Sequence, residues 1–544
     1  MEKEIVDIDN TEEEMVALGN RTAKMFTTIF IGKLLTFLIV GFSFIVVARI
    51  LGPAEYGIYA LAIAVPGLFS AFSDFGLGTS VVKFISEYLG RNEILNIIAL
   101  IKKVFIILLV GAGILTLLSF VMSGFIADSI FHVPSYTFLF EVGSLTVILS
   151  VLFSVATSIL ISMNYNKYLA YTILLQVLTQ AFSSISLALL EFGALAPLLG
   201  TITGLFTGFI AAFYLITANL RKQSKRIEMK QKKQKVKSWR ELLKFSLPLG
   251  ISGGIGNLVN NVAILTLGVY STTVIVGNFS ISNKVSTMFD LIIGSIGIAS
   301  LSLFSFSSSK KSNIIKDPEA KKNTERYYKY SIFFTFLLMF PIILLVVLLA
   351  KPISYTVFSA AYTYAPLYII VMALGVIIYI INSYSSSLIV SIGNVKSILK
   401  YSIIASIVEL ILIPLLIPTE NGFGLSLILF IIIPAISCVL YVYQIRSKIG
   451  LKIPYMQIFK IFLISLLSIV FVIPLIIIFN NNYIPLIIAS IIEQIILYPA
   501  LIGYTKIIDN KIINYMKKMT KDIPLINIIA DLLLKYIEIF VELH

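Results

Sequence analysis

Histidine and cysteine are almost absent from the 544-residue sequence, which holds 2 histidines and 1 cysteine. His132 and His544 lie far apart in the chain, so no His/Cys cluster with metal-ligand spacing is present. The single Cys438 has no partner for an intramolecular disulfide. We therefore expect no bound metal, no cofactor and no disulfide framework.

Charged residues are also scarce, at 13% of the chain, whereas hydrophobic residues make up 58% and the mean hydropathy is +0.97. A soluble protein has about 25% charged and about 45–50% apolar residues. The composition therefore excludes a soluble protein and indicates a polytopic membrane protein. Continuous apolar runs of about 20 residues, without the alternation of barrel strands, predict an all-α fold.

Motifs for nucleotide binding and hydrolysis are missing. Residues 250–256 are rich in glycine but lack a following Lys-Ser/Thr, so close helix packing explains them better than a phosphate-binding loop. No Gly-x-Ser-x-Gly elbow stands out. We therefore expect no catalytic residues and no ATP hydrolysis.

What the sequence does contain is a series of long apolar segments. We predict 14 transmembrane helices, with boundaries uncertain by about two to four residues. They cover residues 28–50, 57–75, 98–123, 137–162, 168–190, 194–217, 243–269, 273–303, 329–349, 364–390, 398–417, 423–444, 457–479 and 484–505.

The positive charges support this topology. All but four of the 42 lysines and arginines fall in segments that share one side of the membrane, the exceptions being Lys33, Arg49, Lys284 and Lys351. The positive-inside rule then places both termini in the cytoplasm of a protein of the cytoplasmic membrane, and it explains the net charge of +14 without nucleic acid. The acidic start of the chain does not resemble a cleavable signal peptide, so the first helix is expected to be an uncleaved anchor.

The spans group into two six-helix lobes followed by two further helices. Gly57-x-Tyr59 is weakly echoed by Gly277-x-Phe279, and an even helix number gives repeats of parallel orientation with a cleft between them. The predicted parts are an acidic N-terminus (1–27), an N-lobe (28–218), a basic linker that contacts anionic headgroups (219–242), a C-lobe (243–445), helices 13 and 14 (446–505) and an amphipathic cytoplasmic helix (506–544).

A family resemblance lies in the first hairpin. The pattern Ala48-Arg49-x-Leu51-Gly52-Pro53-x-x-Tyr56-Gly57-x-Tyr59, followed by residues 72–78, resembles polysaccharide flippases of the multidrug/oligosaccharidyl-lipid/polysaccharide exporter superfamily. The resemblance implies a two-lobed bundle that alternates between inward- and outward-open states. It also implies an oligosaccharide cargo linked to a polyprenyl (di)phosphate. We expect a monomer that contacts membrane lipids and, through its pathway, polysaccharide-assembly enzymes.

The candidate substrate-binding residues are polar groups at membrane depth. A charge facing lipid at a helix centre is unfavourable by about 2.5–3.5 kcal/mol, so such residues are expected to face a cavity, a partner or the interface. Lys33 and Lys284 would supply cations for a phosphate, although Lys33 could snorkel and Lys284 could pair with Asp290. The other candidates are Arg49, which could instead cap its helix, and Asn257 and Asn261, which could instead hold helices together.

A second candidate region is a hinge in the second span. Pro66 removes a backbone hydrogen bond, and Asp74 precedes a glycine-rich break that contains Gly76. Asp74 could bind a coupling cation, and Asp290 is a further coupling candidate. The structural alternatives for Asp74 are an ion pair or a cap on the helix that resumes at Leu77.

Two other functions remain open at this point. A multidrug/cation antiporter of the same superfamily would favour an acidic, aromatic central cavity. A membrane glycosyltransferase or polysaccharide polymerase would need catalytic residues in sizeable external loops, whereas the external segments predicted here are short.

The predicted topology can be tested by cysteine labelling. In a Cys438→Ala background, a cysteine placed at Ser135 or Asn421 should react with a membrane-impermeant thiol reagent added to intact cells, because both positions are predicted to lie outside. A cysteine at Ser224 should react only after the membrane is opened. Labelling at Ser224 in sealed cells would show that the orientation is wrong.

Overall fold

The computed structural model describes the backbone of residues 2–227, 239–309, 318–416, 422–508, 513, 517 and 524–542, apart from residues 92, 164, 393 and 449. The side chains of the first 35 residues, of Asp290 and of most of the basic linker lie outside the described part. The predictions for the Lys33 and Asp290 side chains therefore fall outside it as well.

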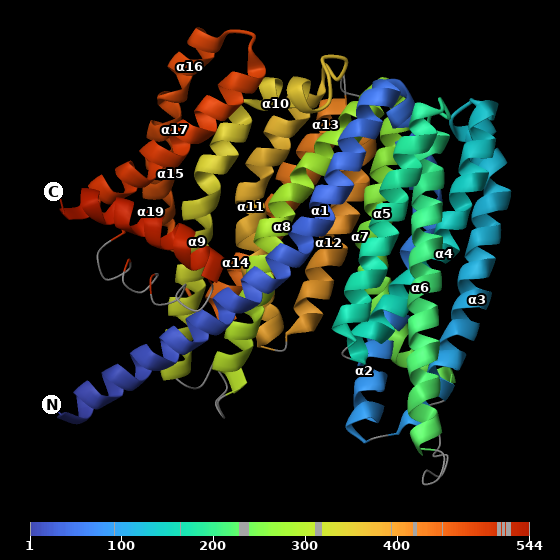
Figure 1. The fold of residues 1–544 in the computed structure, drawn as a ribbon, viewed down its shortest axis with the longest axis horizontal. Coiled ribbons are helices and arrows are strands. Elements are labelled where there is room, and N and C mark those ends of the chain that lie inside the picture. The colour runs from blue at the N-terminus through green and yellow to red at the C-terminus, as the bar shows by residue number, and fades with distance from the viewer. Residues whose placement is uncertain are drawn as a thin grey trace. The chain divides into compact units, whose positions relative to one another are not determined.

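Every regular element in the described residues is helical (Figure 1). The first eight long helices are α1 (Glu2–Ser73), α2 (Leu77–Gly90), α3 (Ile94–Phe125), α4 (Thr137–Ser162), α5 (Asn166–Leu189), α6 (Leu195–Ile227), α7 (Trp239–Tyr270) and α8 (Thr273–Ser309). The later helices are α9 (Pro318–Leu348), α10 (Ala350–Val357), α11 (Ala365–Ser391), α12 (Val395–Leu416), α13 (Phe423–Leu427), α14 (Ile433–Lys448), α15 (Tyr455–Val470), α16 (Val472–Phe479), α17 (Tyr483–Tyr504) and α19 (Pro524–Glu542).

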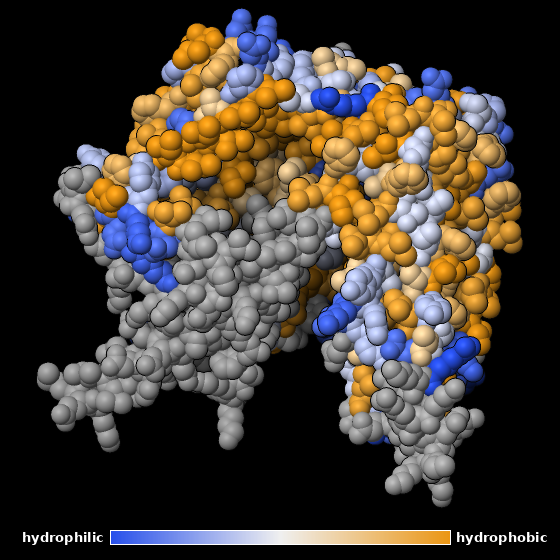
Figure 2. Space-filling model, in the orientation of Figure 1, coloured by the Kyte–Doolittle hydropathy of each residue, from blue (hydrophilic) through white to orange (hydrophobic). Residues whose placement is uncertain are grey.

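The predicted all-α membrane fold is confirmed. Among the described residues, 11 helical segments are long and apolar enough to cross a membrane, and the first, Thr36–Ser73, covers two predicted spans. The predicted seventh and eighth spans correspond to α7 and α8. Apolar side chains such as Ile114, Leu117 and Val121 are exposed along α3, whose outer face is largely orange in Figure 2. A surface of this kind suits contact with lipid.

The described chain forms two compact units. One contains Leu35–Ile281 together with Ser402–Leu425. The other contains Met1–Leu34, Ser282–Tyr401 and Ser426–His544. The predicted lobe boundaries divide the chain differently and stay a prediction.

The first hairpin turns at Gly52, where the helix axis of α1 is broken by a left-handed backbone (φ 71°, ψ 175°). This conformation is easily adopted by glycine, and Pro53 then starts the second segment of α1. Three residues into that segment, the Glu55 carboxylate accepts a hydrogen bond from the Ala194 backbone N–H (2.9 Å) at the start of α6. The first hairpin, which carries the family motif, therefore also caps the N-terminus of α6.

Helices α5 and α6 pack with their backbones in close approach. Gly200, Gly204 and Gly208 recur every fourth residue on α6 and face Ser184, Gln180 and Gln176 of α5. A Cβ at Gly204 would lie 2.7 Å from the Gln180 Cβ. Small residues at this spacing let helices approach closely in a membrane, where apolar burial adds little to association.

In the second unit, several hydrogen bonds join neighbouring helices. The Tyr498 hydroxyl of α17 donates to the Leu337 carbonyl of α9 (2.6 Å), and the Asn382 amide of α11 donates to the Pro434 carbonyl of α14 (2.9 Å). The Tyr328 hydroxyl also hydrogen-bonds Ser385 (2.9 Å). Hydrogen bonds of this kind fix the rotation of each helix against its neighbour.

The C-terminal amphipathic helix α19 packs on α17, with the Ile537 carbonyl 2.6 Å from the position that a Gly503 Cβ would occupy. Its buried side chains are Leu534, Ile537 and Val541, whereas Leu532 is 67% exposed. One part of its apolar surface therefore packs on α17 and another part is left exposed.

A glycine replacement tests the α5–α6 contact. Gly204→Ala should lower the thermal stability of the purified protein, because overpacking is destabilising by about 1–3 kcal/mol. Gly113→Ala is the matched control, since nothing lies within 4 Å of the Cβ it would add to α3. Thermal unfolding in one detergent should separate the two variants, and equal melting temperatures would show that the contact tolerates a methyl group.

Candidate functional site

The predicted site residues that the structure describes lie in different surroundings. Arg49, Asn257 and Lys284 are exposed, whereas Pro66 and Gly76 are buried. Asp74 and Asn261 are intermediate. All of these except Lys284 belong to the unit that contains Leu35–Ile281.

The break between α1 and α2 is the most unusual backbone feature of this unit. Phe75 (φ 50°) and Gly76 (φ 69°) are both left-handed, and the Leu77 N–H donates to the Asp74 carbonyl (2.9 Å). A left-handed conformation is disfavoured by about 1–2 kcal/mol for a residue with a Cβ. The Phe75 ring contacts Gly111 of α3, where a Cβ would lie 2.5 Å from the ring. Packing on α3 therefore holds Phe75 in its strained conformation.

Asp74 lies two residues before Gly76, the N-cap of α2. Its Oδ1 accepts from the Gly78 backbone N–H (3.4 Å), and the negative charge faces the positive end of the helix dipole. Ser158 of α4 approaches the same point, since a Cβ at Gly78 would lie 3.3 Å from its Oγ. Among the side chains that the structure describes, no lysine or arginine forms an ion pair with Asp74.

Helix α7 runs antiparallel along this broken helix through a row of small residues. Gly268 faces Leu61, Gly254 faces the Ala71 carbonyl, and Gly250 faces Gly76. A Cβ at Gly250 would lie 2.5 Å from the Gly76 nitrogen. We call this row the α1–α7 seam. Because Gly250 and Gly254 meet backbone atoms, a methyl group added at either position would have to move a helix.

Asn261 belongs to the α1–α7 seam. Its Nδ2 donates to the Asn257 carbonyl in the same helix (2.8 Å), and its amide oxygen faces Gly67, directly after Pro66. Asn261 thus contacts a second helix, whereas Asn257 is exposed. The two asparagines, which the sequence places on one helix face, are in different surroundings.

Ser246 of α7 was not singled out in the sequence. Its carbonyl contacts the Cβ position of Gly76, and its buried hydroxyl has no hydrogen-bond partner among the described residues. A buried unsatisfied hydroxyl is unfavourable by about 1–3 kcal/mol. The seam therefore carries local strain in both helices at the level of the break. No sequence pattern signals this, because serine is common in membrane helices.

The start of α8 meets the start of the second α1 segment in a reciprocal contact. A Cβ at Gly57 would collide with the Thr273 carbonyl, and one at Gly277 would collide with the Pro53 carbonyl. Each glycine lies one helical turn after the residue that the other glycine touches. The contact therefore has local two-fold symmetry, and it joins the two segments whose sequences echo each other.

Lys284 lies further along α8, and its ammonium forms no ion pair with a described side chain. Its neighbours on the helix are polar, since the Ser286 hydroxyl donates to the Asn283 carbonyl (2.8 Å) and the Thr287 hydroxyl donates to the Lys284 carbonyl (2.6 Å). An exposed lysine on a polar helix face can bind an anion. Arg49 is exposed at the end of the first α1 segment.

A polar chain that the sequence analysis does not single out joins α5 and α6. Gln176 donates to Gln180 (2.8 Å), and Gln180 donates to Thr201 (3.4 Å). The available signal was the pair of glutamines one turn apart in the fifth predicted span.

This arrangement of side chains allows a ligand to bind and the helices to move. In the described part of the chain, no group of three or more His, Cys, Asp or Glu side chains could hold a metal ion. The polar side chains are amides, hydroxyls and isolated charges. Such groups can bind a saccharide or a phosphate without making or breaking bonds.

Comparison with known proteins identifies the family. The model of a family described as "Polysaccharide biosynthesis protein" matches residues 22–305, which is more than half of the chain. A comparison with curated protein sequences gave no match.

Several solved structures share the fold. The lipid II flippase MurJ in an inward closed conformation matches with a TM-score of 0.69 at 17% identity, covering 89% of this chain and 100% of MurJ. An inward-facing multidrug resistance MATE transporter of the MOP superfamily matches with a TM-score of 0.60 at 15% identity, covering 76% of this chain and 94% of the transporter. A MOP superfamily transporter from Pyrococcus furiosus gives a TM-score of 0.54 at 15% identity, with coverages of 80% and 98%. The chain therefore belongs to the family of polysaccharide biosynthesis proteins and has the MOP superfamily fold seen in MurJ and the MATE transporters.

Proposed function

We propose that this protein moves an oligosaccharide linked to a polyprenyl (di)phosphate across the cytoplasmic membrane by alternating access. The family match over residues 22–305 carries this proposal, because it includes the first hairpin, the α1–α2 break, the α1–α7 seam and most of α8. The shared fold supports transport over the membrane-enzyme alternative. Both termini of the chain are proposed to be cytoplasmic.

The cargo explains why isolated charges lie in membrane helices. A sugar chain needs polar side chains, its phosphate needs a cation, and its lipid tail can stay in the bilayer. Lys284 is the described cation best suited to the phosphate, because it is exposed on a polar face of α8. Lys33 is proposed as a second phosphate ligand, and Arg49, Asn257 and Asn261 as further contacts.

The α1–α2 break supports the proposed movement. A helix with two successive left-handed residues has already lost regular hydrogen bonds, so it bends there with little further loss. The buried hydroxyl of Ser246 could gain a partner if the seam shifted. Two discrete packings of this kind are what alternating access requires. Pro66 and Gly76 would then act as hinge residues, with Asp74 and Asp290 as candidates for ion coupling.

A translocation assay tests the cargo and the proposed phosphate contact together. Purified protein in liposomes should move a fluorescent polyprenyl-diphosphate oligosaccharide, and Lys284→Ala should slow this movement about tenfold or more, because a hydrogen bond to a charged group contributes about 1.5–3 kcal/mol. Initial rates with and without proton and sodium gradients are the measurement.

Lys351→Ala is the control, since it removes the same charge from an exposed lysine whose ammonium lies over the Tyr355 ring in α10. If the wild type moves a drug-like cation but no lipid-linked sugar, the antiporter alternative holds. If the wild type moves the sugar and Lys284→Ala does so at the same rate, the function stands and the Lys284 assignment fails.

Two substitutions at Asp74 separate ion coupling from helix capping. Asparagine keeps an oxygen that can accept the Gly78 N–H, whereas alanine does not. If Asp74 couples transport to an ion, Asp74→Asn should abolish the effect of an ion gradient on the rate while the melting temperature stays near that of the wild type. Asp74→Ala should additionally lose about 1 kcal/mol of stability. A normal gradient response in Asp74→Asn would leave Asp74 as a cap alone.

A further inference from the structure

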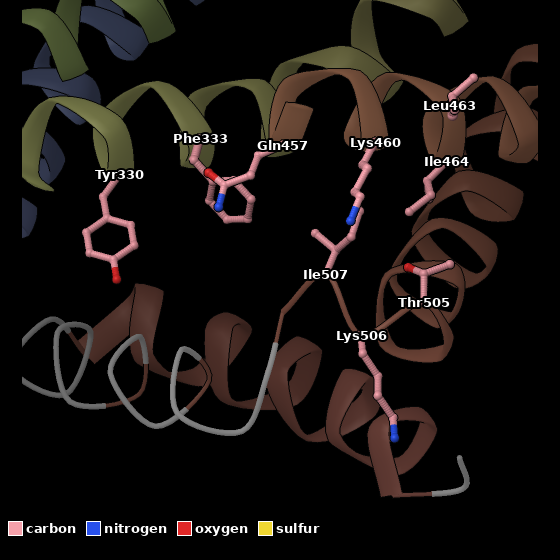
Figure 3. Close-up of a pocket in the computed structure, with 9 residues that line it drawn as sticks. All are labelled: Tyr330, Phe333, Gln457, Lys460, Leu463, Ile464, Thr505, Lys506 and Ile507. Carbon is pink, nitrogen blue, oxygen red and sulfur yellow. The ribbon is translucent and has the colours of Figure 1, made fainter. Parts of the chain in front are cut away.

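A cavity of about 430 Å³ lies in the second unit, outside the segment that matches the family model. Two of its lining residues come from α9, four from α15, and three from the segment 505–507 that follows α17 (Figure 3). Its volume falls in the range of about 300–1,000 Å³ that is typical of small-molecule sites. We call it the α9–α15 cavity.

The α9–α15 cavity contains two lysines from different elements. Lys460 reaches from α15 toward Ile507, and Lys506 leaves the 505–507 segment in another direction, so the two ammonium groups are separate in Figure 3. Both lysines are exposed, and neither forms an ion pair with a described side chain. The Tyr330 hydroxyl and the Gln457 amide line the same cavity. The polar groups are thus two cations with neutral donors, which suits a phosphate ester.

The backbone fixes where Lys506 leaves the chain. Lys506 has a left-handed conformation (φ 51°), and the Thr505 hydroxyl donates to the Leu501 carbonyl at the end of α17 (2.8 Å). Glycine is usual at this position of a helix end, so a lysine here is disfavoured locally. A cation at a helix C-terminus is favourable in any protein and explains Lys506 in part. It does not explain Lys460, which lies in the N-terminal half of α15.

The remaining lining is apolar and leads onto an exposed apolar surface. Phe333 and Ile464 are buried at the cavity, 5% and 8% exposed. On α15, Leu463 is 45% exposed, and Leu467 and Val470 continue the same face at helical spacing. A cationic cavity joined to an apolar helix face fits an amphiphile whose anionic head and acyl chains bind side by side.

We propose that the α9–α15 cavity binds the headgroup of an anionic glycerophospholipid, with Lys460 contacting its phosphate and Lys506 adding a second positive charge at the cavity. The charge pattern predicts that this end of the unit faces the cytoplasm, where the leaflet is rich in anionic lipid. We take the lipid to be a resident of the bilayer, because the apolar face beside the cavity is exposed and could hold its acyl chains, and a polyprenyl phosphate is tested as the alternative. The site does not depend on the proposed transport function.

The test compares two double variants with the same loss of charge. Purified wild-type protein should gain thermal stability as phosphatidylglycerol is added in detergent, and phosphatidylcholine should have no such effect. Lys460→Gln/Lys506→Gln should need at least tenfold more phosphatidylglycerol for half of the effect. Lys396→Gln/Lys400→Gln should behave as the wild type, since it removes two exposed lysines of α12 that do not line the cavity.

Lys460→Arg/Lys506→Arg should keep the response, because arginine retains both charges. If the Gln double variant cannot be purified, the single Lys460→Gln variant, on an exposed position of α15, takes its place in the comparison. Equal responses of the cavity variant and the control variant would overturn the proposal. Stabilisation by a polyprenyl phosphate through the same two lysines, with no response to phosphatidylglycerol, would also overturn it and would assign the cavity to cargo.

Discussion

Direct contact between helix backbones at glycine is the constraint that positions α1, α5, α6, α7 and the start of α8. The α5–α6 pair, the α1–α7 seam and the reciprocal Gly57–Gly277 contact all place backbone atoms where a Cβ would collide. In a bilayer, apolar side chains gain little by leaving lipid for another helix, so close van der Waals approach has to supply the attraction. Such contacts fit in one register only, because sliding by one residue brings a larger side chain to the glycine.

Close packing at glycine also explains why the α1–α2 break matters for movement. A close-packed seam cannot deform gradually, so movement along it requires a change between discrete packings. The break supplies a point where the helix has already lost its regular hydrogen bonds, with Phe75 held by α3 and Gly76 held by α7. Asp74 stabilises the helix that resumes there, through the Gly78 N–H. The residue proposed for coupling is thus also part of the local structure of the hinge, and a change in its charge would affect both.

The second unit combines glycine contacts, such as Gly375 against the Phe430 carbonyl, with interhelical hydrogen bonds. Its helices are joined by hydroxyl and amide hydrogen bonds, including a cluster in which the Ser468 hydroxyl donates to Gln494 (3.0 Å) and the Gln494 amide donates to Glu493 (2.9 Å) between α15 and α17. A buried carboxylate oxygen of Glu493 has no partner among the described residues. Polar groups of this kind specify which helix faces meet. The α9–α15 cavity lies beside the segment that follows α17.

The sequence by itself determined the fold class, the spans and the family. These follow from local properties, because an apolar run of sufficient length has to be helical in a bilayer and the first-hairpin motif is contiguous in the chain. Tertiary structure decided which glycine touches which helix, that Asp74 faces the Gly78 N–H, that Asn257 and Asn261 have different surroundings, and that Lys460 and Lys506 line one cavity. The glycine contacts and the cavity join residues far apart in the chain, and the surroundings of Asp74, Asn257 and Asn261 depend on helix rotations that several packing contacts set together. No periodicity within a single span carries that information.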